Sequence, residues 1–235
     1  MIDVAGIDGT KAGWVVVQIV GQDFAIWSAP DIVAALGRLG PNTLVAIDMP
    51  IGFPDEARRG GRDCEKLARA AMPGRGSSVF GSPCRAALGA ADYEEACLVN
   101  RASSLDGLAL SKQAHALFPK MREIDSAITP ELQARVFEVH PELCFATLAA
   151  SMGTTIRHSK KDPEGFTERW ALLVAAGFPV DDLLAVRKHV KAQADDVLDA
   201  AVSAWTAVRR AQGSALRHPE VPPRDSRGLL MEMWA

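Results

Sequence analysis

The first fifty residues alternate between short apolar runs and polar or glycine-containing breaks. The runs IDVAGI, WVVVQIV and FAIWSA are rich in β-branched and aromatic residues, which predicts three consecutive strands. Asp8 and Gly9 lie between the first two runs, and an Asp-Gly pair in that position is typical of a hairpin turn. Asp8 could therefore serve the turn alone, or it could be one corner of an active site at the end of a strand.

A helix and a fourth strand follow these runs. The segment PDIVAALGRL, which starts at Pro30, has apolar residues at helical intervals and predicts a helix. TLVAIDMP then predicts a strand that is apolar up to Asp48, as in strands that are covered on both faces. The predicted order is thus three strands, a helix and a further strand.

Residues 52–130 have a different texture. They show no strand alternation, and loops surround one helix, with two further helices predicted near 91–103 and 111–122. The chain has 235 residues and a mass of 25.1 kDa, which suits one large domain. We therefore predict a single domain over residues 1–235 that contains a mostly helical insertion at approximately 52–130.

The last hundred residues return to alternating strands and helices. ARVFEVHPELCF predicts a strand that ends near Glu138 and a helix that begins at Pro141. Residues 163–188 hold two amphipathic segments. DDVLDAAVSAWTAVRRAQG predicts a long helix that stops at Gly213, HPEVPPRDSRG a loop, and LLMEMW a short final strand.

Composition narrows the class of protein. Hydrophobic residues make up 48% and charged residues 23%, which predicts a folded chain, and the net charge of −3 argues against coating nucleic acid by bulk electrostatics. A local basic groove stays open. No signal peptide and no apolar run of roughly 18 residues is present, so we expect a cytoplasmic protein without a membrane span. The cysteines form no C-x-x-C pair and are expected to be buried reduced thiols: Cys64, Cys84, Cys97 and Cys144.

Acidic residues end three predicted strands and share one helix face. Asp8, Asp48 and Glu138 end strands, and the carboxyl ends of parallel strands form the crevice in which ligands bind. Asp196 and Asp199 are three residues apart on the last long helix, so they lie on one side of it. Burying so many like charges is costly unless a cation neutralises them, and hard oxygen ligands suit Mg²⁺ or Mn²⁺.

Each acid also has a structural explanation. Asp196 could favour a helix N-terminus, Asp48 could accept hydrogen bonds in the turn toward Pro50, and Glu138 could pair with an arginine. The combination of two strand-end aspartates with a helical D-x-x-D favours a metal site. Its predicted ligands are Asp8, Asp48, Asp196 and Asp199.

Five segments together resemble a known family. GIDGTKAGW, AIDMPIGFP, SSVFGSPCR, EVHPE and DDVLDAAVSAWTA resemble the successive signature blocks of domain-of-unknown-function family 429, described as predicted RNase H-like nucleases. The blocks extend from Asp8 to Ala207 and so cover most of the chain. The resemblance implies the RNase H-like α/β fold, in which three antiparallel strands lead into parallel strands with helices on both faces. The predicted order of elements agrees with it.

The resemblance also implies roles for the acids. By similarity to RNase H-like resolvases, Asp8 matches the acid of the first strand, Asp48 an acid after the fourth, and Asp196 and Asp199 the D-x-x-D-A pattern of the last helix. Glu138 belongs to the family's own EVHPE block. The predicted catalytic set is Asp8, Asp48, Glu138, Asp196 and Asp199.

The implied activity is that of a nuclease or phosphodiesterase acting on nucleic acid or a nucleotide. Two cations held by the carboxylates would clamp the scissile phosphate and activate water. Glu138 or His140 could shuttle a proton, although a histidine before proline at a strand end could also be a structural hydrogen-bonding residue.

Basic residues gather in the insertion and again near residue 160. Arginine forks match phosphate groups, so these residues could grip a substrate, or they could form a solvated helix face. Aromatic residues make up only 6%, which gives little support for a base-stacking platform and leaves a small phosphorylated substrate open. The predicted phosphate-binding residues are Arg62, Arg85, Lys120, Lys160 and Lys161.

Two other classes of protein compete with the hydrolase. A sugar-kinase or actin-type phosphotransferase also carries a GIDGT-like phosphate loop, but it needs two such domains and a second glycine-rich loop, for which 235 residues leave no room. The second competitor is a non-catalytic RNase H-like module that binds nucleotide, nucleic acid or a protein partner. The oligomeric state is left open by the sequence.

Overall fold

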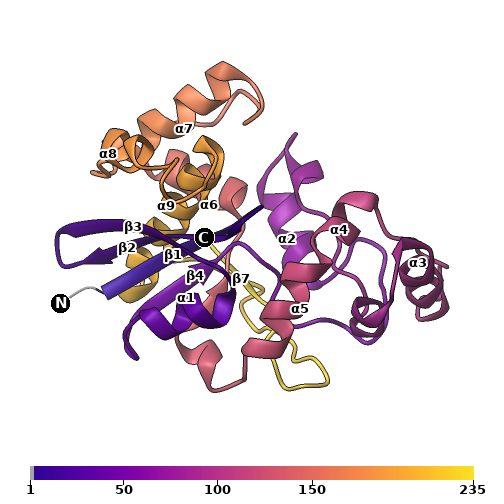
Figure 1. Cartoon of the computed structure of the whole chain (residues 1–235). Coiled ribbons are helices and arrows are strands. Elements are labelled where there is room, and N and C mark those ends of the chain that lie inside the picture. Colours follow the sequence, from indigo (N-terminus) through magenta and orange to yellow (C-terminus); the bar gives the residue numbers. More distant parts are fainter. Residues whose placement is uncertain (1–2) are drawn as a thin grey trace. The chain divides into compact units, whose positions relative to one another are not determined.

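The computed structural model describes residues 3–235, and its central feature is a five-stranded sheet (Figure 1). The strand order is β3-β2-β1-β4-β5; β1, β2 and β3 are antiparallel, whereas β4 and β5 run parallel to β1. This is the RNase H-like α/β arrangement that the sequence predicts. The strands are β1 (Asp3–Thr10), β2 (Gly13–Val20), β3 (Asp23–Ala29), β4 (Leu44–Ile47) and β5 (Val136–Glu138).

The first hairpin turns later than the Asp-Gly pair suggests. Asp8 stays within β1, where it pairs with Val15, and the strand continues to Thr10, which pairs with Gly13. The turn is therefore Lys11–Ala12, with the Ala12 N–H 3.2 Å from Thr10 Oγ1. Gly13 follows with φ +139°, a conformation that glycine adopts far more readily than other residues. The prediction that Asp8 forms the turn is wrong, because the glycine that the turn requires is Gly13.

Helices cover the sheet at the positions that their sequence signals indicate. Asp31 caps α1 (Ile32–Arg38) by accepting the Ala34 N–H at 2.8 Å. Proline occupies the first turn of both α6 (Pro141–Ser151) and α7 (Pro163–Ala175), and α8 spans Val180–Ala185. The long α9 (Ala194–Ala211) has acids in its first turn and arginines in its last, and Gly213 (φ +72°) follows its C-cap as predicted.

Helix α9 lies directly against β1 because β1 carries glycine at the contact. A Cβ atom at Gly6 would lie 2.0 Å from the Ala200 carbonyl oxygen and 2.2 Å from the Ala204 nitrogen. Only a residue without a side chain permits this approach of backbone to backbone. The contact fixes the height of α9 over the strand that carries Asp8.

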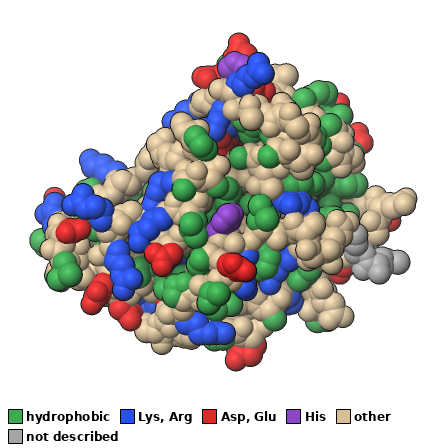
Figure 2. All heavy atoms as spheres, turned by 180° about the vertical axis from the view of Figure 1, so that it is seen from behind, with side chains coloured by type: hydrophobic (Ala, Val, Ile, Leu, Met, Phe, Trp, Pro, Cys, Tyr) green, Lys and Arg blue, Asp and Glu red, His purple; other side chains and the backbone are tan. Residues whose placement is uncertain are grey.

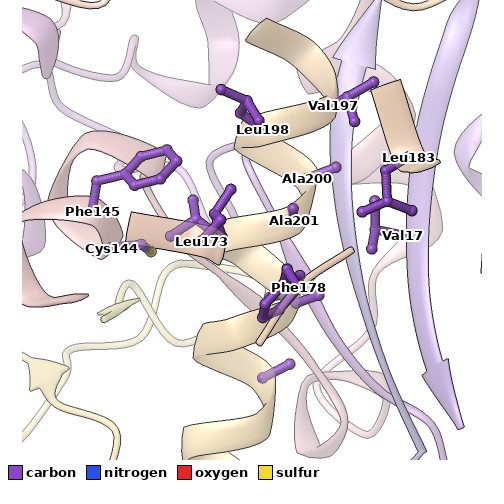
Figure 3. Close-up of a cluster of buried hydrophobic side chains, with 14 of the residues drawn as sticks. Val17, Cys144, Phe145, Leu173, Phe178, Leu183, Val197, Leu198, Ala200 and Ala201 are labelled. Atoms are coloured by element: carbon purple, nitrogen blue, oxygen red, sulfur yellow. The ribbon is translucent and has the colours of Figure 1, made fainter. Parts of the chain in front are cut away.

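The main core lies between the sheet and the helices that follow it. Side chains from β2, α6, α7, α8 and α9 point toward one another in this cluster, among them Val17, Phe145, Leu173, Leu183 and Val197 (Figure 3). Val4, Ala46 and Phe137 add to it from the sheet. Burial of this apolar surface, worth roughly 25 cal/mol per Å², is the principal force that holds α9 in place.

The described chain divides into two compact units. Of the described residues, the first unit comprises 3–48, 135–216 and 234–235, and the second comprises 49–134 and 217–233. In the second unit lie α2 (Asp63–Ala71), α3 (Tyr93–Ala102), α4 (Lys112–Ala116) and α5 (Phe118–Ala127), with short 3₁₀ segments at Gly76–Ser78, Arg85–Gly89 and Leu132–Ala134. Between residues 52 and 130 the regular elements are all helices, as the lack of strand alternation there predicts. The helix predicted near 111–122 is two helices, because Pro119 begins a new first turn.

The second unit also contains a segment that the sequence does not assign to it. The fully buried Asp225 carboxylate accepts the Phe53 N–H at 3.1 Å and the Leu229 N–H at 2.9 Å. Gln133 exchanges two hydrogen bonds with the backbone of Leu230, at 3.0 and 2.7 Å. The loop HPEVPPRDSRG is therefore bonded into the same unit as the insertion.

The chain ends in two very short strands. These are β6 (Arg217–His218) and β7 (Met233–Trp234), and Trp234 forms a parallel bridge with Val139 beside the main sheet. All four cysteines are buried and free, as predicted. Within residues 3–235, no helix combines the length and the apolar character needed to cross a membrane.

Candidate functional site

Strand alternation directs Asp8 toward α9. Val4 belongs to the core beneath α9, Gly6 contacts the α9 backbone, and Asp8 continues the same series of alternate residues. Only 8% of Asp8 is exposed, and its Oδ1 accepts the Gly9 N–H at 2.8 Å. A carboxylate thus lies on the core face of the sheet, at the end of the strand.

Asp48 reaches the same place from the neighbouring strand. Its N–H donates to the Ile7 carbonyl at 2.9 Å, which extends the parallel pairing of β4 with β1 by one residue. Asp48 shares its face of the sheet with Ala46, which packs in the core beneath α9. Because β1 and β4 are parallel, both end at one edge of the sheet, and the charge of Asp48 raises the pKa of Asp8 there.

Asp199 joins the two strand acids from α9. It is only 4% exposed and precedes Ala200, the residue against which Gly6 packs. Its Oδ2 lies 2.9 Å from the Nζ of Lys160, whose side chain is 39% exposed. We refer to Asp8, Asp48 and Asp199 as the aspartate cluster.

The pKa values of the aspartate cluster reflect burial and mutual repulsion. Burial raises the pKa of Asp8 well above its usual value, and the charges of Asp48, Asp199 and Asp196 raise it further. Burial likewise raises the pKa values of Asp48 and Asp199 to about 6, although Lys160 opposes the increase at both. In turn, the Asp199 carboxylate raises the pKa of Lys160. The cluster is therefore electrostatically short of positive charge.

Asp196 is a half-buried neighbour of the cluster with a structural role. Its Oδ2 accepts the Gln193 N–H at 2.8 Å, which forms a capping box at the start of α9. Its charge contributes to raising the pKa of Asp8. The structural explanation offered by the sequence therefore applies to Asp196, and its charge also reaches the cluster.

Glu138 does not share the face of the sheet used by the cluster. Its neighbours in sequence, Phe137 in β5 and Val139 directly after it, belong to the core beneath α9, so alternation turns Glu138 to the other face. Its exposed fraction there is 2%. Glu138 thus lies on the opposite face of the sheet from the aspartate cluster, and its catalytic role stays a prediction.

Sequence reasoning missed Glu142, the second glutamate of the EVHPE block. Its charge raises the pKa of both Asp48 and Asp199, which places it within electrostatic range of the cluster. Glu142 is buried in the first turn of α6 and forms a two-pronged ion pair with buried Arg169, at 2.9 and 2.7 Å. His140, the half-buried N-cap residue of α6, has no side-chain capping bond. The sequence did contain a signal for Glu142. Pro141 marks the start of α6, so the next residue lies in the first turn of that helix.

The chain matches one protein family over most of its length. The family model described as "Protein of unknown function (DUF429)" matches residues 6–224. The chain belongs to the DUF429 family. No curated protein and no solved structure matches the chain. The family match spans the aspartate cluster, Lys160 and the second unit except for residues 225–233.

Two of the predicted phosphate-binding arginines of this DUF429 protein are committed to internal ion pairs. Arg62 is 4% exposed, pairs with Glu65 at 2.8 Å and donates to the Ile51 and Gly52 carbonyls at 2.9 and 3.1 Å. Arg85 pairs with both Asp125 and Asp225. These guanidinium groups hold the second unit together, which corrects their assignment to phosphate.

The three predicted lysines differ in their surroundings. Lys120 lies half-buried on α5, and Lys161 is exposed, with its N–H 3.3 Å from Ser159 Oγ. Lys160 instead contacts the aspartate cluster of this DUF429 protein. Its neighbour in sequence thus provides a natural control for tests of Lys160.

The aspartate cluster has the oxygen ligands that a hard cation prefers, but its side chains are not arranged around a metal position. Three buried carboxylates whose charges act on one another match the oxygen ligands that Mg²⁺ and Mn²⁺ prefer. Across residues 3–235, however, no group of three or more His, Cys, Asp or Glu side chains is arranged as a ready metal site. Lys160 brings a cationic group into contact with one of the carboxylates, that of Asp199.

Proposed function

We propose that this protein hydrolyses phosphodiester bonds in nucleic acid or a nucleotide with the help of Mg²⁺ or Mn²⁺. The observation that carries the proposal is the convergence of Asp8, Asp48 and Asp199 from β1, β4 and α9 at one edge of the sheet. Ligands of open α/β sheets bind at the carboxyl ends of the strands, where these side chains lie. Family membership is compatible with the proposal and adds no activity of its own.

The raised pKa values explain why a divalent cation suits this position. Burial and mutual repulsion make three ionised carboxylates unfavourable in the protein alone, as the values near 6 for Asp48 and Asp199 indicate. Asp8, Asp48 and Asp199 would hold the cation, with Asp196 at the margin. A bound divalent cation would supply charge neutralisation and Lewis-acid polarisation of a phosphoryl oxygen.

The side chains themselves have separable roles. Asp8 and Asp48, at the ends of adjacent parallel strands, would hold the cation from the sheet, and Asp199 would hold it from α9. Lys160 carries a positive charge beside Asp199, at a position that is partly open to solvent, where it can attract a phosphate group. The buried thiols fit the reducing conditions of the cytoplasm, which we propose as its location.

The ion pair between Lys160 and Asp199 supports a second candidate. Because Lys160 already neutralises part of the cluster, the protein could be a non-catalytic module that uses the fold to bind nucleotide, nucleic acid or a protein partner. Such a module needs no divalent cation. Metal binding therefore separates the two candidates.

The deciding experiment is titration of the protein with Mn²⁺ by calorimetry. We expect the wild type to bind Mn²⁺ and Asp8→Asn to lose this binding, because the substitution removes a central carboxylate. Asp195→Asn is the matched control, since it removes an exposed acid from the same helix as Asp199. Single-stranded and duplex RNA and DNA, junctions and nucleotides are then assayed for Mn²⁺-dependent cleavage by both variants.

Two results would count against the hydrolase. If the wild type binds no Mn²⁺ at millimolar concentration even with nucleic acid present, the binding module becomes the better proposal. If Asp8→Asn binds Mn²⁺ as the wild type does, the cation lies elsewhere and the aspartate cluster loses its assigned role.

A further inference from the structure

We propose that the site takes one divalent cation rather than two, because the Lys160 ammonium group occupies the place of a second positive charge. This inference rests on the proposed function and concerns how its site is built. It makes Lys160 a positioning residue for the metal and the substrate phosphate. It also replaces the two-cation arrangement that the family resemblance implies.

The first support is the direct contact between Lys160 and the cluster. Lys160 Nζ lies 2.9 Å from Asp199 Oδ2, and Asp199 is 5% exposed at its side chain. The charges of Asp48 and Asp8 also raise the pKa of Lys160, each by less than the charge of Asp199 does. The ammonium group therefore stands within the field of all three carboxylates.

The second support is that the loop bearing Lys160 is fixed on its N-terminal side. Glu168 of α7 accepts the N–H groups of Arg157 and His158 at 3.1 and 2.9 Å, and its Oε1 lies 2.9 Å from His158 Nδ1. Arg169, held by buried Glu142, reaches the His158 carbonyl at 3.4 Å. Two residues upstream of Lys160, the backbone is thus tied to α7 by several hydrogen bonds.

The same loop is also tied down on its C-terminal side. A Cβ atom at Gly165 would lie 1.8 Å from the Ser159 carbonyl oxygen, so the loop packs on the α7 backbone as closely as glycine allows. The Asp162 N–H donates to the Ser159 carbonyl at 3.0 Å. Lys160 is consequently presented to Asp199 by an anchored backbone, unlike a lysine that happens to fold over a surface acid.

The third support is the balance of charge. The aspartate cluster carries three negative charges when ionised, and Lys160 compensates one of them. Glu142 is compensated by Arg169 through its two-pronged pair, and Asp196 caps the half-buried start of α9. Two negative charges of the cluster remain, and Asp196 adds a third at its margin, so that one divalent cation leaves a single negative charge. A second divalent cation would leave the pocket positive and would stand beside an ammonium group that repels it.

The number of bound ions can be measured without any assay of activity. Calorimetry with Mn²⁺, and electron paramagnetic resonance of bound Mn²⁺, give the stoichiometry for the wild type, Lys160→Met and Lys161→Met. We expect one ion in the wild type, two in Lys160→Met, and one in Lys161→Met. Lys160→Arg keeps the charge and is expected to bind one ion. Thermal unfolding of each variant in EDTA establishes that it is folded.

The outcomes separate this inference from the proposed function. Two ions in the wild type would overturn the inference and leave the metal-dependent hydrolase intact. An unchanged stoichiometry and affinity in Lys160→Met would also overturn it, because Lys160 would then be an ordinary surface lysine. If the wild type binds no ion, the proposed function fails and the inference fails with it.

Discussion

At the scale of single residues, two buried acidic side chains have different surroundings because they lie on opposite faces of the sheet. Asp8 and Glu138 both stand at or near strand ends in buried surroundings. Alternation directs Asp8 beneath α9 and Glu138 to the opposite face. Glu142 then enters the electrostatic environment of Asp48 and Asp199 from a helix. The sequence motifs identified the segments that contain acidic residues. Which acid faces the site depends on strand alternation, because a shift of one residue moves a side chain to the other face of the sheet.

The carboxylates predict a pH dependence of stability in the absence of metal. The pKa of Asp199 is raised to about 6 in the folded protein, so between about pH 4 and 6 the folded state holds a proton that the unfolded chain has lost. This contribution to stability is present at low pH and is lost as the pH rises through 6. In EDTA, we expect the wild type to gain roughly 1–3 kcal/mol relative to Asp199→Asn between pH 7 and pH 4. Urea unfolding at a series of pH values measures the difference, and a constant difference would contradict the prediction.

The buried pair of Glu142 and Arg169 yields a second prediction. Removing one partner leaves an uncompensated buried charge, so Arg169→Met should destabilise the protein by about 3–5 kcal/mol. The double variant Glu142→Gln with Arg169→Met should recover much of this loss, since no isolated charge then remains. Equilibrium unfolding in urea compares the three proteins. Equal losses in the single and double variants would show that packing, and not charge, dominates.

At the scale of elements, the contact between α9 and β1 assembles the site. Gly6 lets the backbone of α9 approach β1, and the apolar face of α9 completes the core (Figure 3). In α9, Asp199 directly precedes Ala200, whose backbone contacts Gly6. In β1, Asp8 lies two residues after Gly6. The distance between the two carboxylates is consequently set by a glycine that carries no chemistry of its own.

A substitution at Gly6 tests this assembly. Gly6→Ala would place a Cβ 2.0 Å from the Ala200 carbonyl, so α9 must shift; we expect a loss of about 1–3 kcal/mol or more and weaker Mn²⁺ binding. Gly37→Ala in α1 is the matched control, because no atom lies within 4 Å of its new Cβ. That variant should be stabilised by about 0.5–1 kcal/mol, as alanine is favoured over glycine inside a helix. Unfolding and calorimetry of both variants provide the comparison, and an unperturbed Gly6→Ala would refute the close contact.

At the scale of the whole molecule, charge is distributed rather than concentrated. Acidic, basic and apolar side chains are interspersed on the face shown in Figure 2, and the net charge is −3. Several arginines of the second unit, such as Arg62 and Arg85, are consumed by internal pairs. The distribution favours recognition of phosphate at a local site over bulk attraction to a polyanion.

Metal binding should stabilise the whole folded protein through mass action. Mn²⁺ at about 100 times its dissociation constant adds roughly 2.7 kcal/mol to the free energy of unfolding. For a chain of this size, the melting temperature should rise by about 5–10 °C. Thermal unfolding of wild type and Asp8→Asn, each with Mn²⁺ and with EDTA, measures the effect. An equal shift in both proteins would mean that Mn²⁺ acts outside the aspartate cluster.

The sequence by itself determined the order of strands and helices along the first fifty residues, the lack of strands in the insertion and the family blocks, and it singled out Asp8, Asp48 and Asp199 among its candidate acids. These features follow from local periodicity, capping residues and short motifs, all of which are written within a few neighbouring positions. Only the tertiary structure decided the remainder. It placed Asp8 inside a strand, turned Glu138 away, recruited Glu142, committed Arg62 and Arg85 to internal pairs, and set Lys160 on Asp199. The physical reason is that the face on which a side chain lies depends on how distant elements pack, and so does a distant partner, such as the Asp199 that Lys160 meets across 39 residues.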